Sequence, residues 1–342
     1  MSDAVWSADD TTPGAVEAAL RAMETERHQE DRAVPARVLN LVTIVDAAWR
    51  GEIENRLARV GRYHASRTVL CAVEPDRDRL SARASVHVEG DAVREHVLLE
   101  IGERHLRRLD RVIDPVVVTD LATAVWAPHG HDAAVDAVCG VAQVVLRDSV
   151  DEPDARAALD RAAELARRTY VVDLAWLRTT PWRERIAATF DPPAWRGHLR
   201  KLSAVTVRHH PDSAVAALLL LGWLASRLGW EPSALAGREG SLQGRARARR
   251  GDVVLRTEPT EQGVRGLAGV TLETADGMAL SLDRAKGGLA ARRRFPDGRE
   301  ARWTVLGASR GEPGILGEGI RQALLREPTY EPALRAARAL AG

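Results

Sequence analysis

The first half of the chain alternates between almost continuous apolar runs and amphipathic segments. Residues 37–46 and 67–73 are rich in β-branched and other apolar side chains, which is typical of strands buried on both faces. Between them, apolar residues recur at helical spacing over residues 47–60, and Gly61 ends the pattern. A strand, a helix and a strand in this order predict a parallel pair joined by a right-handed crossover.

Shorter runs follow and extend the predicted sheet. Segments 81–88 and 97–101 alternate apolar and polar residues on either side of a Glu-Gly-Asp turn, so we expect an antiparallel pair. Together with the parallel pair, these elements predict an α/β domain with a mixed sheet over residues 35–195. Its other predicted strands are residues 116–118, 124–126 and 141–146, and its other predicted helices are residues 103–111 and 153–169.

Residues 170–191 close this half with an unusual content of tryptophan and arginine. Their pattern predicts a short strand, a tight turn and an amphipathic helix, with Thr180 as the N-cap and Pro181 at the first helical position. Asp191 and the two prolines after it end the helix, and residues 192–201 are the predicted linker to a second domain.

The pattern changes after residue 196. Residues 202–209 alternate as a strand, and Asp212 caps a predicted helix over residues 213–228. Six short alternating segments between residues 241 and 305 predict an antiparallel meander. Two helices, at 315–326 and 330–341, complete a predicted α+β domain with an antiparallel sheet over residues 196–342.

The mostly polar residues 1–34 precede both predicted domains. Apolar residues at positions i, i+4 and i+7 predict one amphipathic helix over residues 13–28. Because its apolar stripe is narrow, we interpret residues 1–34 as an N-terminal helical arm that packs on the body or faces a partner.

The composition is that of an ordinary globular protein. The chain has 342 residues, of which 45% are hydrophobic and 28% are charged, a length that suits two domains. Its net charge of +1 argues against a nucleic-acid-binding surface, and its longest apolar run, residues 214–225, is too short to span a bilayer. No signal-peptide pattern begins the chain, and Cys71 and Cys139 lie in apolar segments, so we expect buried thiols in a cytoplasmic protein.

The sequence offers no convincing motif for catalysis or for a cofactor. No glycine-rich dinucleotide fingerprint follows the first predicted strand, and no P-loop occurs. Residues 307–311 match G-x-S-x-G, but no histidine follows Ser309, so we interpret the match as chance. The glycines of residues 307–319 precede a helix and could hold an anion, yet no lysine completes such a site. We therefore predict no catalytic residue and no cofactor.

Two histidine pairs are candidate metal ligands. His129 and His131 lie beside Asp132, but a zinc site needs three or four protein ligands and no further ligand lies nearby in the sequence. His209 and His210 end a predicted strand before a proline, which indicates a turn with exposed imidazoles. No metal site is predicted.

Two other sets of residues are candidates for binding. Trp176, Arg178, Trp182 and Arg183 lie within eight positions, and tryptophan and arginine are enriched at interfaces, so this segment is a candidate partner-binding site. Packing of the two tryptophans is the alternative interpretation. Arg67 starts a predicted strand and could bind a phosphate or a carboxylate, with a structural ion pair as the alternative.

Several segments of the chain carry a family resemblance. The two most specific are Asp-Leu-Ala-Trp-Leu-Arg-Thr-Thr-Pro-Trp-Arg-Glu at 173–184 and Ala-Ala-Leu-Leu-Leu-Leu-Gly-Trp-Leu-Ala-Ser-Arg-Leu-Gly-Trp at 216–230. Weaker matches, in the same order along the chain, are residues 37–42, 64–67, 120–126 and 330–337. In these segments the chain resembles the OpcA family, the actinobacterial glucose-6-phosphate dehydrogenase assembly proteins.

The resemblance implies a cytoplasmic protein that is not itself an enzyme. Such a protein binds glucose-6-phosphate dehydrogenase and favours its assembled, active form, which supports the oxidative pentose phosphate pathway and NADPH supply. It implies no nucleic-acid or membrane partner. Two alternatives stay open from the residues: a transferase that uses the sheet edge near Arg67, and a sensor that binds a sugar phosphate or a nucleotide in the α/β domain.

Overall fold

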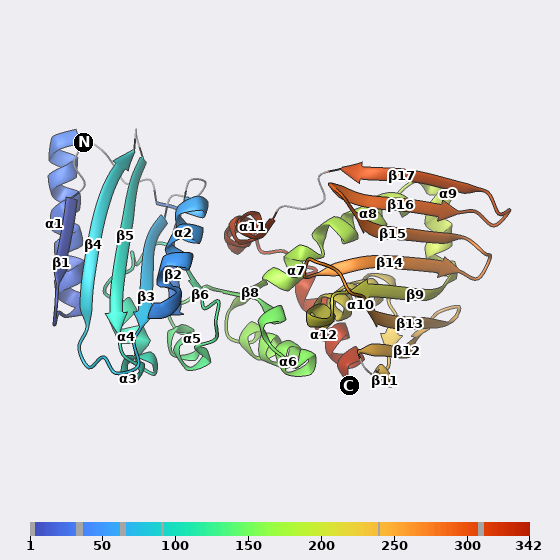
Figure 1. Cartoon of the computed structure of the whole chain (residues 1–342), viewed down its shortest axis with the longest axis horizontal. Helices are drawn as coiled ribbons and strands as arrows, with labels where there is room; N and C mark the ends of the chain where they lie inside the picture. The colour runs from blue at the N-terminus through green and yellow to red at the C-terminus, as the bar shows by residue number, and fades with distance from the viewer. Residues whose placement is uncertain (1–3, 32–36, 62–65, 90–91, 239, 307–310) are drawn as a thin grey trace. The chain divides into compact units, whose positions relative to one another are not determined.

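The computed structural model describes residues 4–31, 37–61, 66–89, 92–238, 240–306 and 311–342, which fold into two compact units (Figure 1). The described residues of the first unit belong to Met1–Arg147, Arg168–Val172 and Leu316–Leu325. Those of the second unit belong to Asp148–Arg167, Asp173–Ile315 and Arg326–Gly342. Each unit is built on its own β-sheet.

The first unit has the predicted α/β architecture with a mixed sheet, whose strand order is β1-β4-β5-β3-β2-β6-β7-β8. Parallel pairs join β2 to β3 and β6, β3 to β5, and β6 to β7, whereas β4 pairs antiparallel with β1 and β5. Its strands are β1 (Ala4–Ala8), β2 (Leu39–Asp46), β3 (Ser66–Val73), β4 (Ser81–Glu89), β5 (Ala92–Ile101), β6 (Thr123–Trp126), β7 (Val144–Arg147) and β8 (Tyr170–Asp173). Its helices are α1 (Pro13–Asp31), α2 (Arg50–Gly61), α3 (Glu103–Leu106), α4 (Leu109–Ile113) and α5 (Asp132–Val138).

The described N-terminal residues pack on the body of the first unit, which is one of the two alternatives expected for them. The predicted helix is confirmed as α1, whose Val16 and Leu20 are 0% and 1% exposed within the hydrophobic core. The sequence did not predict β1, which pairs antiparallel with β4 along one edge of the sheet. Its five-residue run forms a strand because β4 supplies the hydrogen-bond partners, and β4 lies far away in the sequence.

Residues 116–118 form a turn after α4, and the prediction of a strand there was wrong. Val116 is fully buried, which explains the apolar pattern. The Asn40 side chain takes the place of a neighbouring strand: its Oδ1 accepts from the Val118 amide at 3.0 Å, and its Nδ2 donates to the Val118 carbonyl at 2.9 Å. A buried apolar run therefore needs no β-ladder when a side chain satisfies its backbone.

The Trp- and Arg-rich segment after β8 is more helical than predicted. α7 (Leu174–Arg178) replaces the expected turn, and α8 (Thr180–Phe190) follows it directly. Thr180 is the first residue of α8 rather than its N-cap, and Pro181 lies in the first turn of that helix. The predicted linker is helical too, with α9 (Pro193–Arg196) and the 3₁₀ helix η3 (Gly197–Lys201).

The chain passes between the two units at positions other than the boundary expected near residue 195. Residues 148–167 and 173–195 belong to the second unit, together with α6 (Ala155–Ala166), α7 and α8. There, α6 contacts the C-terminal helix α12 (Tyr330–Ala341), and α7 contacts α10 (Ala214–Leu228). The expected boundary was inferred from local proline content, which carries no information about these contacts with distant segments.

The second unit has the predicted α+β architecture with a mostly antiparallel sheet. Its strand order is β10-β12-β13-β9-β14-β15-β16-β17, with β11 beside β12 (Figure 1). The pair β9–β13 is parallel, which departs from a purely antiparallel meander, because the chain crosses over through α10 between them. The strands are β9 (Leu202–His209), β10 (Glu231–Pro232), β11 (Ala236–Arg238), β12 (Ser241–Ala248), β13 (Gly251–Pro259), β14 (Leu267–Thr274), β15 (Ala279–Ala285), β16 (Gly288–Arg294) and β17 (Glu300–Leu306).

The apolar block that resembles the family forms α10, a core helix of the second unit. Residues Pro211–Leu228 have a mean hydropathy of 1.2, so they are long and apolar enough to cross a membrane by composition alone. Of this stretch, 61% is buried within the protein, and α10 contacts β9, β13 and α12. The burial explains the apolar composition as that of a core helix.

Gly222 sets how closely α10 and α12 approach. A Cβ atom at this position would lie 2.3 Å from the Ala333 carbonyl oxygen and 2.8 Å from the Ala337 nitrogen, both on α12. These are backbone atoms that cannot move without shifting the helix. A glycine here is therefore required by packing, although it disfavours helix formation.

We expect Gly222→Ala to lower the free energy of unfolding by about 1–3 kcal/mol, because overpacking outweighs the gain in helix propensity. Gly317 in α11 (Gly311–Leu325) is the matched control, since an added Cβ there meets nothing within 4 Å. Gly317→Ala should raise stability by up to about 1 kcal/mol. Urea denaturation of both variants measures the difference, and the same sign for the two would contradict the packing argument.

Candidate functional site

α7 and α8 bring two of the predicted partner-binding residues into contact. Trp176 is only 2% exposed, and its ring centroid lies 5.7 Å from that of Tyr330. Its indole Nε1 donates a hydrogen bond to Glu327 Oε2 at 2.9 Å. The Arg183 guanidinium covers the indole, with Cζ 3.6 Å from the ring centroid, which is a cation–π contact. Trp176 is thus enclosed within the second unit.

The Arg183 side chain is fixed by the turn that joins the two helices. Its Nε donates to Thr179 Oγ1 at 3.0 Å, and its Nη2 donates to Thr180 Oγ1 at 2.9 Å. Burial lowers the pKa of Arg183 from its ordinary value to about 10, although Glu327 and Glu184 oppose the shift. The guanidinium is therefore still charged at neutral pH, and the indole face offsets part of its lost hydration.

Asp173 is the centre of a buried hydrogen-bond network at the start of α7. Its carboxylate is completely buried and accepts from the Ala175 amide at 2.9 Å, the Ser149 amide at 3.1 Å and the Tyr330 hydroxyl at 3.1 Å. The Ser149 hydroxyl donates a further, short hydrogen bond. These donors join α7 to α12 and to the 3₁₀ helix η2 (Ser149–Asp151). The network satisfies the carboxylate without any ligand.

Arg178 forms a bidentate ion pair with Asp148, which N-caps η2. The Arg178 Nη1 and Nη2 atoms lie 2.8 Å and 2.6 Å from the two Asp148 carboxylate oxygens. The side chains are 14% and 10% exposed, so the pair is largely removed from water. Burial raises the pKa of the Asp148 carboxyl, whereas the Arg178 charge acts in the opposite direction.

The four residues of the candidate partner-binding segment thus lie mainly inside the second unit. Trp182 is 2% exposed and shares a buried face of α8 with Ile186 and Phe190. Trp176, Arg178 and Arg183 make the internal contacts described above. These contacts favour the packing interpretation of the segment, and direct contact with a partner stays a prediction.

Arg67, the candidate anion-binding residue, lies in a charged cluster of the first unit. Its Nε donates to Glu95 Oε2 at 2.7 Å, its Nη1 donates to the Val116 carbonyl at 2.9 Å, and its Nη2 pairs with Glu24. Arg37 pairs with both glutamates. Two carboxylates already neutralise the two guanidinium groups, so the geometry favours a structural ion pair over a phosphate site.

The structure overturns the expectation for His209 and shows the neighbour of His131. His209 is 1% exposed, so the expectation of an exposed imidazole was wrong at this position; the strand β9 carries the ring inward, and its Nδ1 lies 2.8 Å from the His210 carbonyl. The His131 Nε2 lies 3.0 Å from Asp46 Oδ1. Across the described ranges, no group of three or more His, Cys, Asp or Glu residues could hold a metal ion.

Both cysteines are buried, as predicted. Cys71 is 0% exposed and Cys139 is 7% exposed. Burial raises the pKa of the Cys71 thiol to about 12, so this thiol is protonated and unreactive at neutral pH. The G-x-S-x-G match lies largely at residues 307–310, outside the described residues, and the glycines 311, 314, 317 and 319 lie within α11 rather than before a helix.

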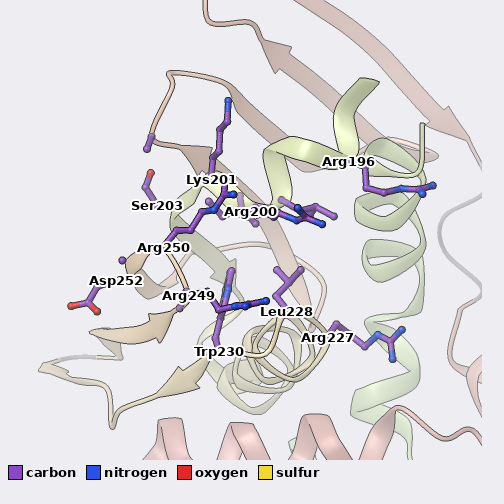
Figure 2. Close-up of a pocket in the computed structure, with 15 residues that line it drawn as sticks. Arg196, Arg200, Lys201, Ser203, Arg227, Leu228, Trp230, Arg249, Arg250 and Asp252 are labelled. Carbon is purple, nitrogen blue, oxygen red and sulfur yellow. The ribbon is translucent and has the colours of Figure 1, made fainter. Parts of the chain in front are cut away.

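A strongly basic cavity of the second unit was not foreseen from the sequence. It has a volume of about 900 Å³ and lies between η3, the end of α10 and the turn that joins β12 to β13. We call it the basic hollow. Its basic lining residues are Arg196, Arg200, Lys201, Arg227, Arg249 and Arg250, with Asp252 as the one carboxylate of the lining (Figure 2). Leucine side chains and Trp230 contribute its apolar lining.

Sequence reasoning missed the basic hollow because its arginines come from three separate segments. The dipeptides Arg200-Lys201 and Arg249-Arg250 were the available signals, each beside a predicted strand end. Neither is long enough to indicate a site, because short basic pairs are common on solvated surfaces. Only the pairing of β9 with β13 brings the two dipeptides to the same end of the sheet.

Two family models match the chain. Residues 32–164 match the model described as the N-terminal domain of the glucose-6-phosphate dehydrogenase subunit. Residues 169–334 match the model described as the C-terminal domain of the same subunit. The matched regions together include β2 to β7 of the first unit and the whole sheet of the second unit.

Curated relatives carry a related description. The chain is 29% identical over 138 residues to the "Putative OxPP cycle protein OpcA" of Nostoc punctiforme. These residues make up 39% of this chain and 30% of the relative. It is 28% identical over 138 residues to the protein of the same name from Synechocystis sp., covering 39% of this chain and 29% of the relative. The similarity thus spans less than a third of the length of these relatives.

Solved structures resemble the chain only distantly. The superposition on the transcriptional regulator Gal80p from Kluyveromyces lactis covers 91% of this chain and 91% of that protein, with a TM-score of 0.49 and 8% identity. An apo scyllo-inositol dehydrogenase from Lactobacillus casei covers 90% of this chain and 96% of its own, with a TM-score of 0.47 and 11% identity. Similarity at this level says nothing about activity.

Proposed function

The chain belongs to the OpcA family of glucose-6-phosphate dehydrogenase assembly proteins, and on that premise we propose that it binds this dehydrogenase and favours its assembled, active form. The observation that carries the proposal is the pair of matches to domains of the dehydrogenase subunit over residues 32–164 and 169–334. The curated relatives named for the OxPP cycle point to the same pathway. We further propose a cytoplasmic protein that supports the oxidative pentose phosphate pathway and NADPH supply.

The physical mechanism that we propose is linkage between binding and assembly. A protein that binds the active oligomer more tightly than the inactive state shifts the population toward the active form. The size of the shift is limited by the ratio of the two affinities, so a tenfold preference can shift the equilibrium at most tenfold, or about 1.4 kcal/mol. No bond needs to be made or broken by the activator itself.

We propose that the protein contributes no catalytic group of its own. The buried polar residues that could have formed a site are engaged with one another: Asp173 with Ser149 and Tyr330, and Asp148 with Arg178. In the first unit, Arg67 is engaged by Glu95 in the same way. Side chains held in such pairs support an architectural role, because their charges and hydrogen-bonding groups are already occupied by one another.

The proposal predicts a change in the dehydrogenase when the two proteins are mixed. We expect the purified dehydrogenase of the same organism to form a complex of higher mass with this protein, and to show a changed KM or kcat at saturation. Light scattering coupled to gel filtration measures the mass, and NADPH absorbance measures the rate.

The control is the chain alone, which should show no turnover of glucose 6-phosphate with NADP⁺. A dehydrogenase whose mass and kinetic constants are the same at saturating concentrations of this protein would rule the proposal out. Turnover by the chain alone would instead favour the alternative of an enzyme.

A further inference from the structure

We propose that the basic hollow of the second unit binds an organic diphosphate of the nucleotide class. The inference rests on the geometry of residues 196–252 and does not depend on the proposed assembly role. The hollow is distinct from the α/β domain, in which the sequence placed its alternative of a sugar-phosphate or nucleotide sensor.

The basic hollow carries positive charge that acidic side chains do not compensate. Arg200, Arg227, Arg249 and Arg250 make no ion pair or side-chain hydrogen bond with any residue in the described part of the chain. Of the other charged groups of the lining, Arg196 donates a hydrogen bond to the Asp191 carbonyl at 2.7 Å, Lys201 pairs with Asp276 at 2.8 Å, and Asp252 lies 3.6 Å from Arg245 outside the hollow. Four like charges around one cavity repel one another, so an anion that enters it gains from all of them.

The contrast with the rest of the second unit supports this argument. Its other sheet arginines commonly have carboxylate partners, such as Arg208 with Asp283 at 2.7 Å and Arg302 with Glu300 at 3.0 Å. The arginine-rich composition is thus balanced locally by acidic side chains in those places. The basic hollow lacks that balance, which marks it as a site for an external anion.

Helices and a hairpin turn bring the backbone of these arginines together. Arg249 and Arg250 occupy the turn of the β12–β13 hairpin, which is closed by the pair Ala248 and Gly251. Gly251 has φ 116°, a conformation that favours glycine and lets the chain enter β13. Arg200 lies on η3 and Arg227 in the last turn of α10, so regular elements set where the backbone of each residue lies around the hollow (Figure 2). Their exposed side chains remain available to an anion.

The size and the lining of the hollow suit an organic anion. A volume of about 900 Å³ lies within the range of small-molecule sites, which is roughly 300–1,000 Å³. Leu199, Leu228 and Trp230 give it an apolar portion beside the arginines. A ligand that fits both parts carries an organic body together with its charges, which favours a nucleotide over an inorganic ion.

The number of arginines indicates two phosphoryl groups. The terminal phosphoryl group of a nucleoside diphosphate carries about −1.5 to −2 charges at neutral pH and the inner one carries about −1, so four guanidinium groups suffice to neutralise both. The guanidinium fork also matches phosphate oxygens in a bidentate manner. A nucleic acid would need an extended basic stripe, whereas these charges surround one concave site.

The test titrates the full-length protein with ADP, adenosine and inorganic pyrophosphate by calorimetry at low ionic strength. We expect ADP to bind and to raise the thermal unfolding temperature, adenosine not to bind, and pyrophosphate to bind more weakly than ADP. The variant Arg200→Gln with Arg250→Gln should bind ADP at least about a hundredfold more weakly, because each lost charge-assisted hydrogen bond costs about tenfold or more.

The matched control carries Arg294→Gln and Arg335→Gln, which replace two exposed arginines of the second unit outside the hollow. It should bind ADP as the wild type does, and both variants should unfold at the wild-type temperature without ligand, since all four side chains are exposed. Absence of ADP binding at millimolar concentration overturns the proposal, as does equal weakening in the control. Pyrophosphate binding as tightly as ADP, or a single-stranded oligonucleotide binding more tightly, overturns the assignment to a nucleotide.

Discussion

Replacing Arg178 with methionine is expected to lower the free energy of unfolding by about 3–5 kcal/mol at neutral pH. The substitution keeps much of the apolar stem but removes the guanidinium that pairs with both Asp148 oxygens at 2.8 Å and 2.6 Å. Because the Asp148 side chain is only 10% exposed, its charge would be buried without this partner. The cost of an uncompensated buried charge greatly exceeds the net value of the pair itself. Urea denaturation at neutral pH measures the loss.

The loss should shrink as the pH falls, and the sign follows from the Asp148 pKa. Burial raises this pKa above its ordinary value of 3.8, so the folded protein holds more protons than the unfolded chain between the two values. The contribution of the carboxyl is most favourable below its unfolded pKa and is lost as the pH rises through its folded pKa. Without Arg178 the pKa of Asp148 in the folded protein rises further. Lowering the pH therefore increases the free energy of unfolding more in the variant than in the wild type.

Two further variants make this test decisive. Arg168→Met removes an exposed pair with Asp136, in which both side chains are 40% exposed, and should cost less than about 1 kcal/mol. Adding Asp148→Asn to Arg178→Met removes the buried charge and should recover part of the stability. A loss below about 1 kcal/mol for Arg178→Met, or a loss that is the same at every pH, would contradict the buried-charge argument.

Trp176→Ala should also cost about 3–5 kcal/mol, because it leaves a cavity where a large buried ring had packed. The indole is 2% exposed, lies 5.7 Å from the Tyr330 ring and donates a hydrogen bond to Glu327 at 2.9 Å. Its loss also uncovers the Arg183 guanidinium, which lies 3.6 Å above the ring. Trp176→Phe keeps an aromatic face and should cost less than the alanine variant. Thermal and urea unfolding of the two variants give the comparison.

Trp49→Ala is the matched control, since Trp49 is 47% exposed in the first unit and should tolerate the change with a much smaller loss. Measuring dehydrogenase affinity at a temperature where each variant is folded separates packing from partner contact. The packing interpretation expects an unchanged affinity for folded Trp176→Phe. A tenfold loss of affinity without a loss of stability would instead establish Trp176 as a contact with the partner.

Local patterns in the sequence predicted the elements whose stability depends on their immediate neighbours. Period-two alternation located β9 and β12 to β17 of the second unit but not the short β10 and β11, and helical spacing located α1, α2 and α10. The same patterns predicted both fold classes. They failed at β1 and at residues 116–118, because a strand needs a hydrogen-bonding neighbour as well as apolar residues, and the identity of that neighbour is not local.

The candidate site shows the same limit. The sequence identified Trp176, Arg178, Trp182 and Arg183 as unusual, but the side chains that surround them come from distant segments. The contacts of Trp176 with Tyr330 and Glu327 decide that it packs inside the second unit. Their separation of about 150 residues hides them from any window of the sequence.

The sequence by itself determined the family, the two fold classes and most of the helices and strands, because these follow from residue types and their periodicity. Tertiary structure alone decided which unit residues 148–167 and 173–195 join, which buried charges are paired, and where unpaired charge gathers. The basic hollow depends on the pairing of β9 with β13, which brings Arg200 and Arg250 to one end of a sheet. Electrostatic energy depends on distance in space, and only the fold sets that distance for residues far apart along the chain.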